Sequence, residues 1–493
     1  MFPFDRLLPI DKNAAKPLYL QIAQMLSEAI RNGVLQPGTA LPSSRNMAAL
    51  LQVHRKTIIA AYDELSTQDW IETQPRKKTV VAAHIPLLQP QEWSQPRALL
   101  PYENAMPTVF KSFTPTPSAA LPGLPELIVD DGRPDIRISP IDLLLKTYRS
   151  SIQRRYASRN AEQNMSQGSD ALRSVLEGYL AESRGINISK DHLLVTHGAQ
   201  MSIYIASALL IRPGTAIIVG TPNYPMANAV FQQQGAELVE VGVDQFGIDT
   251  DQIEKICRLR TIAAVYVIPH HHYPTTVTLS VERRMKLLRL SLQYAFLIIE
   301  DDYDYDYHYT SSPYLPLASA QHCGNVIYIG SFSKILDPQL RIGFMVAPKN
   351  FIEQAVAFRK TIDIGGDGYM QDALAALIRD GELKRHIKKA KKTYQLRKDF
   401  LEQLLDEHLS SYLTYQSPSG GMAIWLCFKS EISVVELGRW TAKHRLQIND
   451  INQSLNAFRF GFASLNEREI AAAIALVTKG VLALAKKSPQ ADC

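Results

Sequence analysis

The densest group of chemically reactive residues lies in the segment GSFSKILDPQLRIGF, which begins at the end of an apolar run. Ser331 and Ser333 frame Lys334, and Arg341 follows the lysine seven positions later. A lysine amine can form a Schiff base with the aldehyde of pyridoxal 5'-phosphate (PLP). Hydroxyl groups and the planar fork of a guanidinium can hold the phosphate of this cofactor. A lone lysine is usually a surface residue, but its neighbours here favour a PLP site.

A second group of polar residues ends the apolar run in FLIIEDDYDYDYHY. PLP needs a carboxylate at its pyridine nitrogen and benefits from a donor to its phenolic oxygen. Asp301 and Tyr303 fit these two roles, because sites in open α/β sheets form where strands end. The alternating tyrosines leave no compact set of metal ligands, so we expect three further acids to be solvated or structural: Asp302, Asp304 and Asp306.

Three other segments could complete such a site. In VTHGAQMSIY, the residues Gly198, Ala199 and Gln200 open a helix whose positive end could bind a phosphate through backbone N–H groups. Tyr224 in GTPNYP could stack on the cofactor ring or belong to the core, and the sequence leaves both readings open. Arg459 in FRFGFA stands among apolar residues, and a buried arginine needs an anion. We expect it to bind an effector carboxylate, with an internal salt bridge as the alternative.

The segments that must position these residues alternate between apolar runs and helical patterns. Six runs predict strands covered on both faces: HLLVTHG, GTAIIVGTP, IAAVYVIPHH, AFLIIEDDY, NVIYIGSFS and IGFMVAP. They predict a large α/β domain with a mostly parallel sheet over residues 126–493. We place its large part at about 185–350 and a helix-rich α+β subdomain, with the strand SGGMAIWLCF and a final helix, at about 360–493. Residues 85–125 are rich in proline and predict an extended linker.

Residues 1–84 predict a separate, small α/β unit. Apolar residues recur at helical spacing in PLYLQIAQMLSEAIRNG, and a turn at Pro37-Gly38 follows. A second helix starts in LPSSRNMAALL, where Ser43 or Ser44 can cap it, and a third spans HRKTIIAAYDELSTQ. WIETQPRKKTVVA then suggests two short strands joined by a basic turn. This order is typical of a winged helix-turn-helix.

In a helix-turn-helix, the second helix of the pair enters the major groove of double-stranded DNA, and its first turn meets bases and phosphates. Cations there can neutralise phosphates, and an arginine can instead make a paired contact to guanine. Exposed charges are more often merely solvated, so the prediction depends on how they are grouped. The DNA-binding candidates are Ser44, Arg45, His54, Arg55, Lys56, Thr57, Arg76, Lys77 and Lys78.

The composition sets broad limits on the protein class. The 493 residues contain no membrane-spanning apolar run, and the first residues do not form a signal-peptide pattern. The four cysteines lie far apart and match no metal spacing, which suits a reducing cytoplasm. The net charge of +5 is too small to indicate a nucleic-acid partner by itself.

Both halves of the chain resemble known families. The segments PLYLQIAQMLSEAI and LQPGTALPSSRNMAALLQVHRKTIIAAYDELSTQDWIETQP resemble the DNA-binding domain of GntR-family bacterial regulators. The five segments with reactive residues, together with Gly132-Arg133-Pro134-Asp135 and Gly168…Leu172-Arg173, resemble fold-type I PLP enzymes of the class I aminotransferase family. The whole chain is therefore similar to MocR/GabR-type regulators.

The resemblance implies particular roles for five residues. Lys334 would be the Schiff-base lysine, Asp301 would face the pyridine nitrogen, and Tyr303 the phenolic oxygen. Arg341 would bind the phosphate and Arg459 a carboxylate. Fold-type I sites usually form at a dimer interface, so the resemblance also implies a homodimer.

The chain departs from the family patterns at three places. The GntR wing usually turns at glycines, where this chain has Pro75-Arg76-Lys77-Lys78. In VIPHHHYPTTVTL, Thr276 stands where a glycine usually follows Pro-Thr, and Tyr273 replaces an asparagine that touches the cofactor oxygen in aminotransferases. Tyr273 remains a cofactor-pocket candidate. The tract His270-His271-His272 suggests metal binding, but consecutive side chains on a strand point alternately, so we favour a pocket-lining role.

Two functions follow from these expectations. The first is a DNA-binding transcription regulator that senses an amino acid, an amine or PLP itself. Binding of this ligand would change how a dimer presents its two N-terminal DNA-binding units, or heads, to paired operator half-sites. The second is a PLP-dependent aminotransferase with an accessory DNA-binding head. A residual half-reaction of transaminase type is compatible with either function. We favour the regulator, working in the cytoplasm at operators in the nucleoid, because a complete DNA-binding domain is an odd attachment for a metabolic enzyme.

Overall fold

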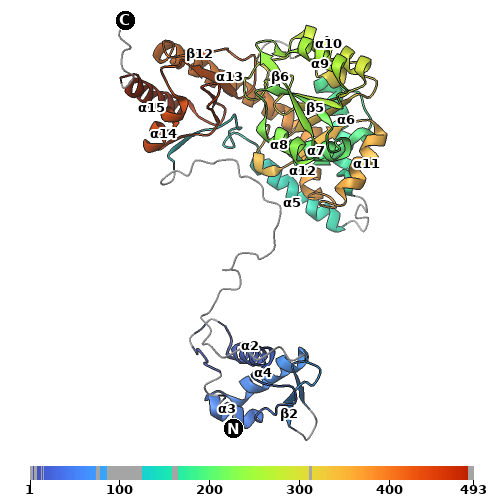
Figure 1. The fold of residues 1–493 in the computed structure, drawn as a ribbon, viewed down its shortest axis with the longest axis vertical. Coiled ribbons are helices and arrows are strands. Elements are labelled where there is room, and N and C mark those ends of the chain that lie inside the picture. The colour runs from blue at the N-terminus through green and yellow to red at the C-terminus, as the bar shows by residue number, and fades with distance from the viewer. Residues whose placement is uncertain are drawn as a thin grey trace. The chain divides into compact units, whose positions relative to one another are not determined.

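The computed structural model describes residues 4, 8–12, 14, 16–73, 78–85, 125–157, 165–309 and 314–486 of the chain. The chain divides into two compact units, residues 1–117 and 118–493, which are described separately (Figure 1). The division falls within the range predicted as a linker, of which residues 86–124 lie outside the described part. The limits expected for the three regions therefore stay predictions.

The first unit is a winged helix-turn-helix, as the sequence predicts. Its elements are α2 (Leu18–Arg31), α3 (Ser44–Leu51), α4 (Arg55–Thr67) and the antiparallel strands β1 (Ile71–Thr73) and β2 (Thr79–Val81). Ser43, rather than Ser44, caps α3, because its hydroxyl accepts a hydrogen bond from the backbone N–H of Asn46. Buried apolar side chains from all three helices form the core: Ile22, Leu26, Met47, Ile58 and Leu65.

An eight-stranded sheet is the basis of the second unit. Its strands are β4 (Leu193–Thr196), β5 (Ala216–Thr221), β6 (Glu237–Asp244), β7 (Gly247–Ile248), β8 (Ala264–Val267), β9 (Leu297–Asp302), β10 (Val326–Ser331) and β11 (Gly343–Val346). They lie in the order β4-β11-β10-β9-β8-β5-β6-β7. The neighbours from β10 to β6 are parallel, whereas β11 is antiparallel to β10 and β4, and β7 to β6. All six predicted runs form strands of this mostly parallel sheet.

Helices cover both faces of the sheet. They are α5 (Ile141–Ala157), α6 (Asp170–Arg184), α7 (Ala199–Leu210), α8 (Pro225–Gln233), α9 (Thr250–Leu259), α10 (Val281–Tyr294), α11 (Lys349–Arg359) and α12 (Gly368–Arg379). Ile299 and Ile329 pack with residues of α7, α8 and α11. Ile298 and Val265, which point to the other face, pack with residues of α9 and α10. This double cover explains why the central strands are continuously apolar.

The C-terminal part has its own sheets and core. Its elements are α13 (Glu382–His408), β12 (Leu413–Tyr415), β13 (Ala423–Phe428), α14 (Val434–Lys443), β14 (Leu446–Ile448), β15 (Ile451–Asn452), β16 (Ala457–Gly461) and α15 (Glu467–Ala485). One sheet has the order β12-β13-β16-β15, and β14 pairs in parallel with β3 (Leu127–Val129) from the start of the unit. The segment after the predicted linker is therefore joined to the C-terminal part. No helix in the described ranges is long and apolar enough to cross a membrane.

Candidate functional site

The ends of neighbouring strands bring the predicted reactive residues together. Asp301 lies in β9 beside Ile329 of β10, and the two strands are parallel, so Tyr303 and Lys334 follow at the same edge of the sheet. A cavity of about 140 Å³ opens there. Its lining residues are Asp131, Ala199, Gln200, Tyr224, Ile268, Tyr273, Asp301, Tyr303, Ser331, Ser333, Lys334 and Arg341.

The acid expected at the pyridine nitrogen is buried in the wall of this cavity. The hydroxyl of Tyr266 donates a 2.7 Å hydrogen bond to Asp301 Oδ2. Asp301 Oδ1 is buried and has no partner among the described residues. Burial raises the pKa of Asp301 to about 7, although the bond from Tyr266 lowers it. A carboxyl group with one unmatched buried oxygen fits a cationic N–H donor such as a protonated pyridine nitrogen.

The amine of Lys334, also on the cavity wall, lies next to Asp131, which the sequence analysis did not single out. Nζ donates a 2.7 Å hydrogen bond to the carbonyl oxygen of Gly132 and lies 3.5 Å from Oδ2 of Asp131. The charge of Lys334 is the main reason that the pKa of Asp131 falls to about 2. Asp131 is thus a cavity residue that sequence reasoning missed. The only signal was its place directly before the motif Gly132-Arg133-Pro134-Asp135.

Polar groups suited to a phosphate gather at the start of α7. Gly198 precedes this helix with a φ of +80°, so the backbone N–H groups of Ala199 and Gln200 lie at its positive end. Nη2 of Arg341 donates to the carbonyl of His197 at 3.0 Å. A Cβ atom at position 198 would lie 2.9 Å from the same Nη2, so glycine leaves the room that the guanidinium occupies. Gly198 borders the cavity in this way without lining it.

The two serines of the lysine segment complete this side of the cavity. The hydroxyl of Ser331 accepts the backbone N–H of Ser333 at 3.2 Å. The hydroxyl of Ser333 is buried without a partner in the described part of the chain. The residues present therefore fit PLP at both ends: a carboxylate for the ring nitrogen, and hydroxyl, guanidinium and helix N–H groups for the phosphate.

Arg459 lies behind the tyrosines of the cavity wall. It is only 1% exposed, and its Cζ lies 5.1 Å from the ring centre of Tyr273. Nε donates to the carbonyl of Asp131 at 2.7 Å, and Nη2 donates to the hydroxyl of Tyr303 at 2.9 Å. The ion pairs found among the described residues include none for Arg459, so they give the internal salt-bridge alternative no support. The arginine adjoins the cavity but does not line it.

The two other aromatic candidates do line the cavity. The hydroxyl of Tyr303 donates to the carbonyl of His271 at 2.8 Å, so its role toward a phenolic oxygen stays a prediction. Tyr224 is half-buried, packs edge-to-face on Tyr273 with ring centres 5.3 Å apart, and also contacts the core between the sheet and α7. Tyr224 therefore contacts both the cavity and the core, and its stacking on a cofactor ring stays a prediction.

The pocket-lining role expected for the three histidines is wrong for the cavity that holds Lys334, and only His272 borders another, much smaller cavity, beside Tyr266. They lie in a loop after β8, not on a strand, and none of them lines the Lys334 cavity. Each is buried and bonded elsewhere: His270 Nδ1 lies 3.2 Å from Asp302 Oδ1, His271 Nδ1 lies 2.9 Å from Asp304 Oδ1, and His272 Nδ1 lies 3.0 Å from Thr275 Oγ1. Burial lowers the pKa of His272 to about 3, so this imidazole is neutral at physiological pH.

These contacts also decide whether the three further acids, Asp302, Asp304 and Asp306, are solvated or structural. Asp302 and Asp304 are buried against histidines, and Asp306 forms a 2.7 Å ion pair with Arg184. The structural role is confirmed, and the expectation that these acids are solvated is wrong. In the same loop, Thr276 has a φ of +61°, in the left-handed region that favours glycine, so the structure does not explain why a threonine stands there.

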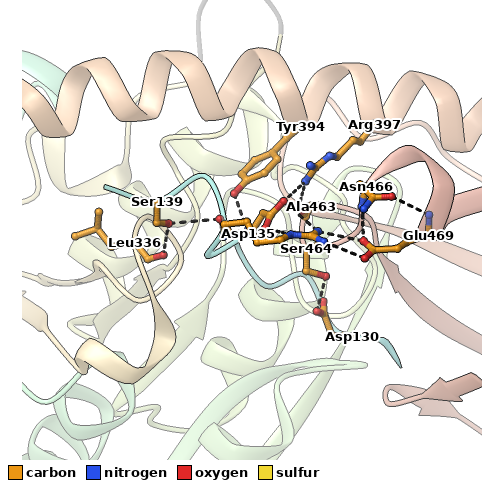
Figure 2. A network of polar contacts seen from close by, with 11 residues as sticks. Asp130, Asp135, Ser139, Leu336, Tyr394, Arg397, Ala463, Ser464, Asn466 and Glu469 are labelled. Carbon is orange, nitrogen blue, oxygen red and sulfur yellow. Dashed lines mark hydrogen bonds and ion pairs between the residues drawn. The ribbon is translucent and has the colours of Figure 1, made fainter. Parts of the chain in front are cut away.

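A polar network holds the segment that carries Asp131 (Figure 2). Asp135 is the centre: its carboxylate pairs with Arg137 at 2.7 Å and with Arg397 of α13 at 2.9 Å. The hydroxyl of Ser464 donates to Asp130 Oδ2 at 2.7 Å, and that of Ser139 donates to the carbonyl of Leu336 at 2.7 Å. The segment is therefore tied both to the C-terminal part and to the loop that follows Lys334.

In the first unit, the structure brings the starts of α3 and α4 together. Nε of Arg55 donates to the hydroxyl of Ser44 at 3.3 Å, and His54 caps α4 by accepting the N–H of Lys56 at 3.2 Å. The candidates Arg45, His54, Arg55, Lys56 and Lys78 are exposed, whereas Ser44 and Thr57 are partly buried. Arg76 and Lys77 lie outside the described residues.

Comparison with known proteins matches both units. Residues 144–485 match the family described as "Aminotransferase class I and II", and residues 18–81 match "Bacterial regulatory proteins, gntR family". The uncharacterized HTH-type transcriptional regulator YdfD of Bacillus subtilis is 28% identical over 434 residues, covering 86% of this chain and 88% of its own. The probable rhizopine catabolism regulatory protein MocR of Rhizobium meliloti is 27% identical over 430 residues, covering 85% and 83%. The structure of Pyrococcus horikoshii kynurenine aminotransferase has a TM-score of 0.67 at 24% identity, over 72% of this chain and 91% of that one, which shows a shared fold.

Proposed function

We propose that this chain, which belongs to the aminotransferase class I and II family and carries a gntR-family DNA-binding head, is a MocR-type transcription regulator that senses an amino compound through PLP. PLP supplies an aldehyde that captures amines reversibly. Lys334 would hold the cofactor through its amine, and Asp301 would accept a hydrogen bond from the protonated ring nitrogen. Ser331, Ser333, Arg341 and the start of α7 bind its phosphate.

The observation that carries the proposal is the unmatched oxygen of Asp301. A buried carboxyl oxygen without a donor costs free energy on the order of 1–3 kcal/mol. The protein keeps this oxygen in the wall of a cavity that is also lined by Lys334 and by the first residues of α7. A cofactor with a cationic ring N–H, an aldehyde and a phosphate provides a partner for each of these groups.

Effector recognition would use Arg459. A guanidinium has five N–H donors, and here three are directed to Asp131, Tyr303 and the Pro274 carbonyl, the last at 3.4 Å. Among the described residues, the other two donors have no partner, which leaves them for a carboxylate. Because the ring of Tyr273 lies against the guanidinium, we expect this ring to move when an effector carboxylate binds.

DNA recognition would use the adjacent starts of α3 and α4. Arg45, Arg55 and Lys56 are exposed there, where cations can bind phosphates and an arginine can pair with guanine. We further propose a homodimer whose two heads bind paired half-sites of chromosomal operators in the cytoplasm. An effector, or PLP itself, would regulate the protein by binding with different affinities to its DNA-bound state and its DNA-free state.

Absorbance spectroscopy with added PLP tests the cofactor half of this proposal. We expect a visible band in the wild-type protein that Lys334→Ala lacks, with the same circular dichroism in both. No Lys334-dependent band would contradict the proposal. Screening amino compounds against the band, and then against DNA binding by fluorescence anisotropy, tests the sensing half. Sustained release of a keto acid without any change in DNA binding would instead support the aminotransferase.

A further inference from the structure

The carboxylate of Asp131 has no part in holding the cofactor as described above. We propose that Asp131 and the carbonyl of Gly132 form a receiving site for the amine of Lys334 once an effector amine has displaced it from the cofactor. Asp131 would then be a positioning residue that makes displacement favourable. This inference rests on the proposed function, because it requires PLP to be attached to Lys334.

The position of the Lys334 amine motivates the proposal. Nζ donates to Gly132 O at 2.7 Å and lies 3.5 Å from Asp131 Oδ2, so both oxygens are within reach of this amine. The Lys334 side chain is 18% exposed and that of Asp131 is 35% exposed, so the contact is only partly screened by water. Among the described residues, the other carboxylate on the cavity wall is Asp301, which bonds to Tyr266.

The exchange needs no further reactant. The effector nitrogen forms a bond to the aldehyde carbon of the cofactor, and the bond from that carbon to Lys334 Nζ breaks. The effector nitrogen gives up the N–H hydrogens that it loses on forming the C=N bond, two of them when that bond is protonated before and after, and Nζ takes up the same number, so the lysine leaves as an ammonium and the total charge does not change. A carboxylate and a carbonyl oxygen that accept this ammonium lower the free energy of the displaced state, because charge-assisted hydrogen bonds are stronger than neutral ones.

The receiving site is held in place from three directions. The Asp130 carboxylate accepts the N–H groups of Gly132 and Arg133 at 2.8 and 2.9 Å, which fixes the turn. Nε of Arg459 holds the carbonyl of Asp131 at 2.7 Å, and β3 pairs with β14 directly before the turn. Arg133, whose Nε lies 3.6 Å from Asp131, is 61% exposed and competes only weakly with the ammonium.

The proposal predicts opposite effects on two measurable processes. A site that stabilises free Lys334 opposes attachment of PLP and favours its displacement. In Asp131→Asn, we expect the PLP concentration for half-saturation to fall about five- to tenfold, and displacement by amines to weaken by a similar factor. A purely structural defect would weaken both processes together.

The test uses the full-length protein and aminooxyacetate as the probe. This compound captures PLP from lysine and leaves Nζ as an ammonium, whatever the natural effector is. Loss of the Lys334-dependent absorbance band gives the displacement rate, and a PLP titration gives the half-saturation concentration. Asp142→Asn, which removes an exposed acid from the first turn of α5, is the matched control and should change neither quantity. Asp131→Glu keeps the charge and should retain more of the displacement rate than Asp131→Asn.

Slower displacement together with tighter PLP binding in Asp131→Asn supports the receiving site. If both processes weaken, or if neither changes, the inference is wrong and the proposed function stands. If the wild-type protein shows no Lys334-dependent band, both are wrong. Melting curves of the variants reveal misfolding. If Asp131→Asn is destabilised, Asp131→Glu shows whether the slower displacement comes from loss of the charge or from a change in structure.

Discussion

Tyr266 on β8 donates a 2.7 Å hydrogen bond to one oxygen of Asp301 on β9, and the other oxygen of that carboxyl is buried without a partner among the described residues. The tyrosine therefore orients the carboxyl while leaving one oxygen for a donor that enters the cavity. It also counteracts burial, which is the larger influence and brings the pKa of Asp301 to about 7.

Tyr266→Phe should weaken PLP binding at neutral pH. Loss of the hydroxyl removes the bond that lowers the pKa of Asp301, so more of this acid is protonated and less of it can hold a charged ring nitrogen. A hydrogen bond to a charged group contributes about 1.5–3 kcal/mol, so we expect at least about a tenfold rise in the half-saturation concentration. Absorbance titration measures it. Tyr328→Phe, which removes a buried hydroxyl that bonds Asp302 instead, is the control, and an equal loss there would contradict the role of Tyr266.

The cofactor-free protein should lose stability as the pH rises toward 7 and beyond. The folded-state pKa of Asp301, about 7, lies above the unfolded value near 4, so the folded form binds the proton more tightly. Its contribution is complete below pH 4 and is lost as the pH rises through 7, with a span of at most about 4 kcal/mol. Glu300, with a pKa raised by burial to about 8, acts in the same direction. Urea unfolding at pH 5.5 and pH 8 should therefore show a smaller difference in Asp301→Asn than in the wild type, and identical differences would contradict the assignment.

Gly198→Ala should impair PLP binding through Arg341. The new Cβ would lie 2.9 Å from Nη2 of Arg341, and a φ of +80° also strains any residue with a side chain. The guanidinium must then leave the position from which it can bind a phosphate, so we expect about a tenfold or greater loss of PLP affinity. Gly214→Ala separates the two causes, because Gly214 has a φ of +84° but no heavy atom within 4 Å of its added Cβ. This control should cost about 1 kcal/mol of stability and leave PLP affinity unchanged.

The cofactor residues could be predicted from the sequence because each stands in a segment of distinctive composition. Lys334 with its serines, and Asp301 at the end of an apolar run, are recognisable before the fold is known. Asp131 could not be found in this way, since a single acid before a glycine is common and its contact with Lys334 joins residues some 200 positions apart. The tertiary contact, rather than any local pattern, gives it a place at the site.

The histidine tract shows a second limit of sequence reasoning. The pocket-lining interpretation assumed that the strand continues through His270–His272, but β8 ends at Val267 and His271 has a φ of +46°. The tract therefore turns away from the cavity, and Asp302 at the end of β9 and Asp304 just after it bind the buried rings of His270 and His271. Similarly, β6 was not among the expected strands because ELVEVGVD mixes acids with apolar residues in a half-exposed strand near the edge of the sheet.

Arg55→Ala should weaken DNA binding more than the loss of one charge elsewhere on the head. Arg55 is the first residue of α4, exposed and held beside the start of α3 by its bond to Ser44, so its charge lies where both helices can approach DNA. If Arg55 contacts phosphate, affinity should fall for all sequences and the slope of log K against log salt should decrease by about 1. If it pairs with guanine, we expect a loss of about 1–3 kcal/mol confined to one operator position. Fluorescence anisotropy on duplexes selected from a random pool by the wild-type protein distinguishes these results. Arg31→Ala, at the exposed end of α2, is the matched control, and an equal loss of affinity in both variants would show that only the total charge of the head matters.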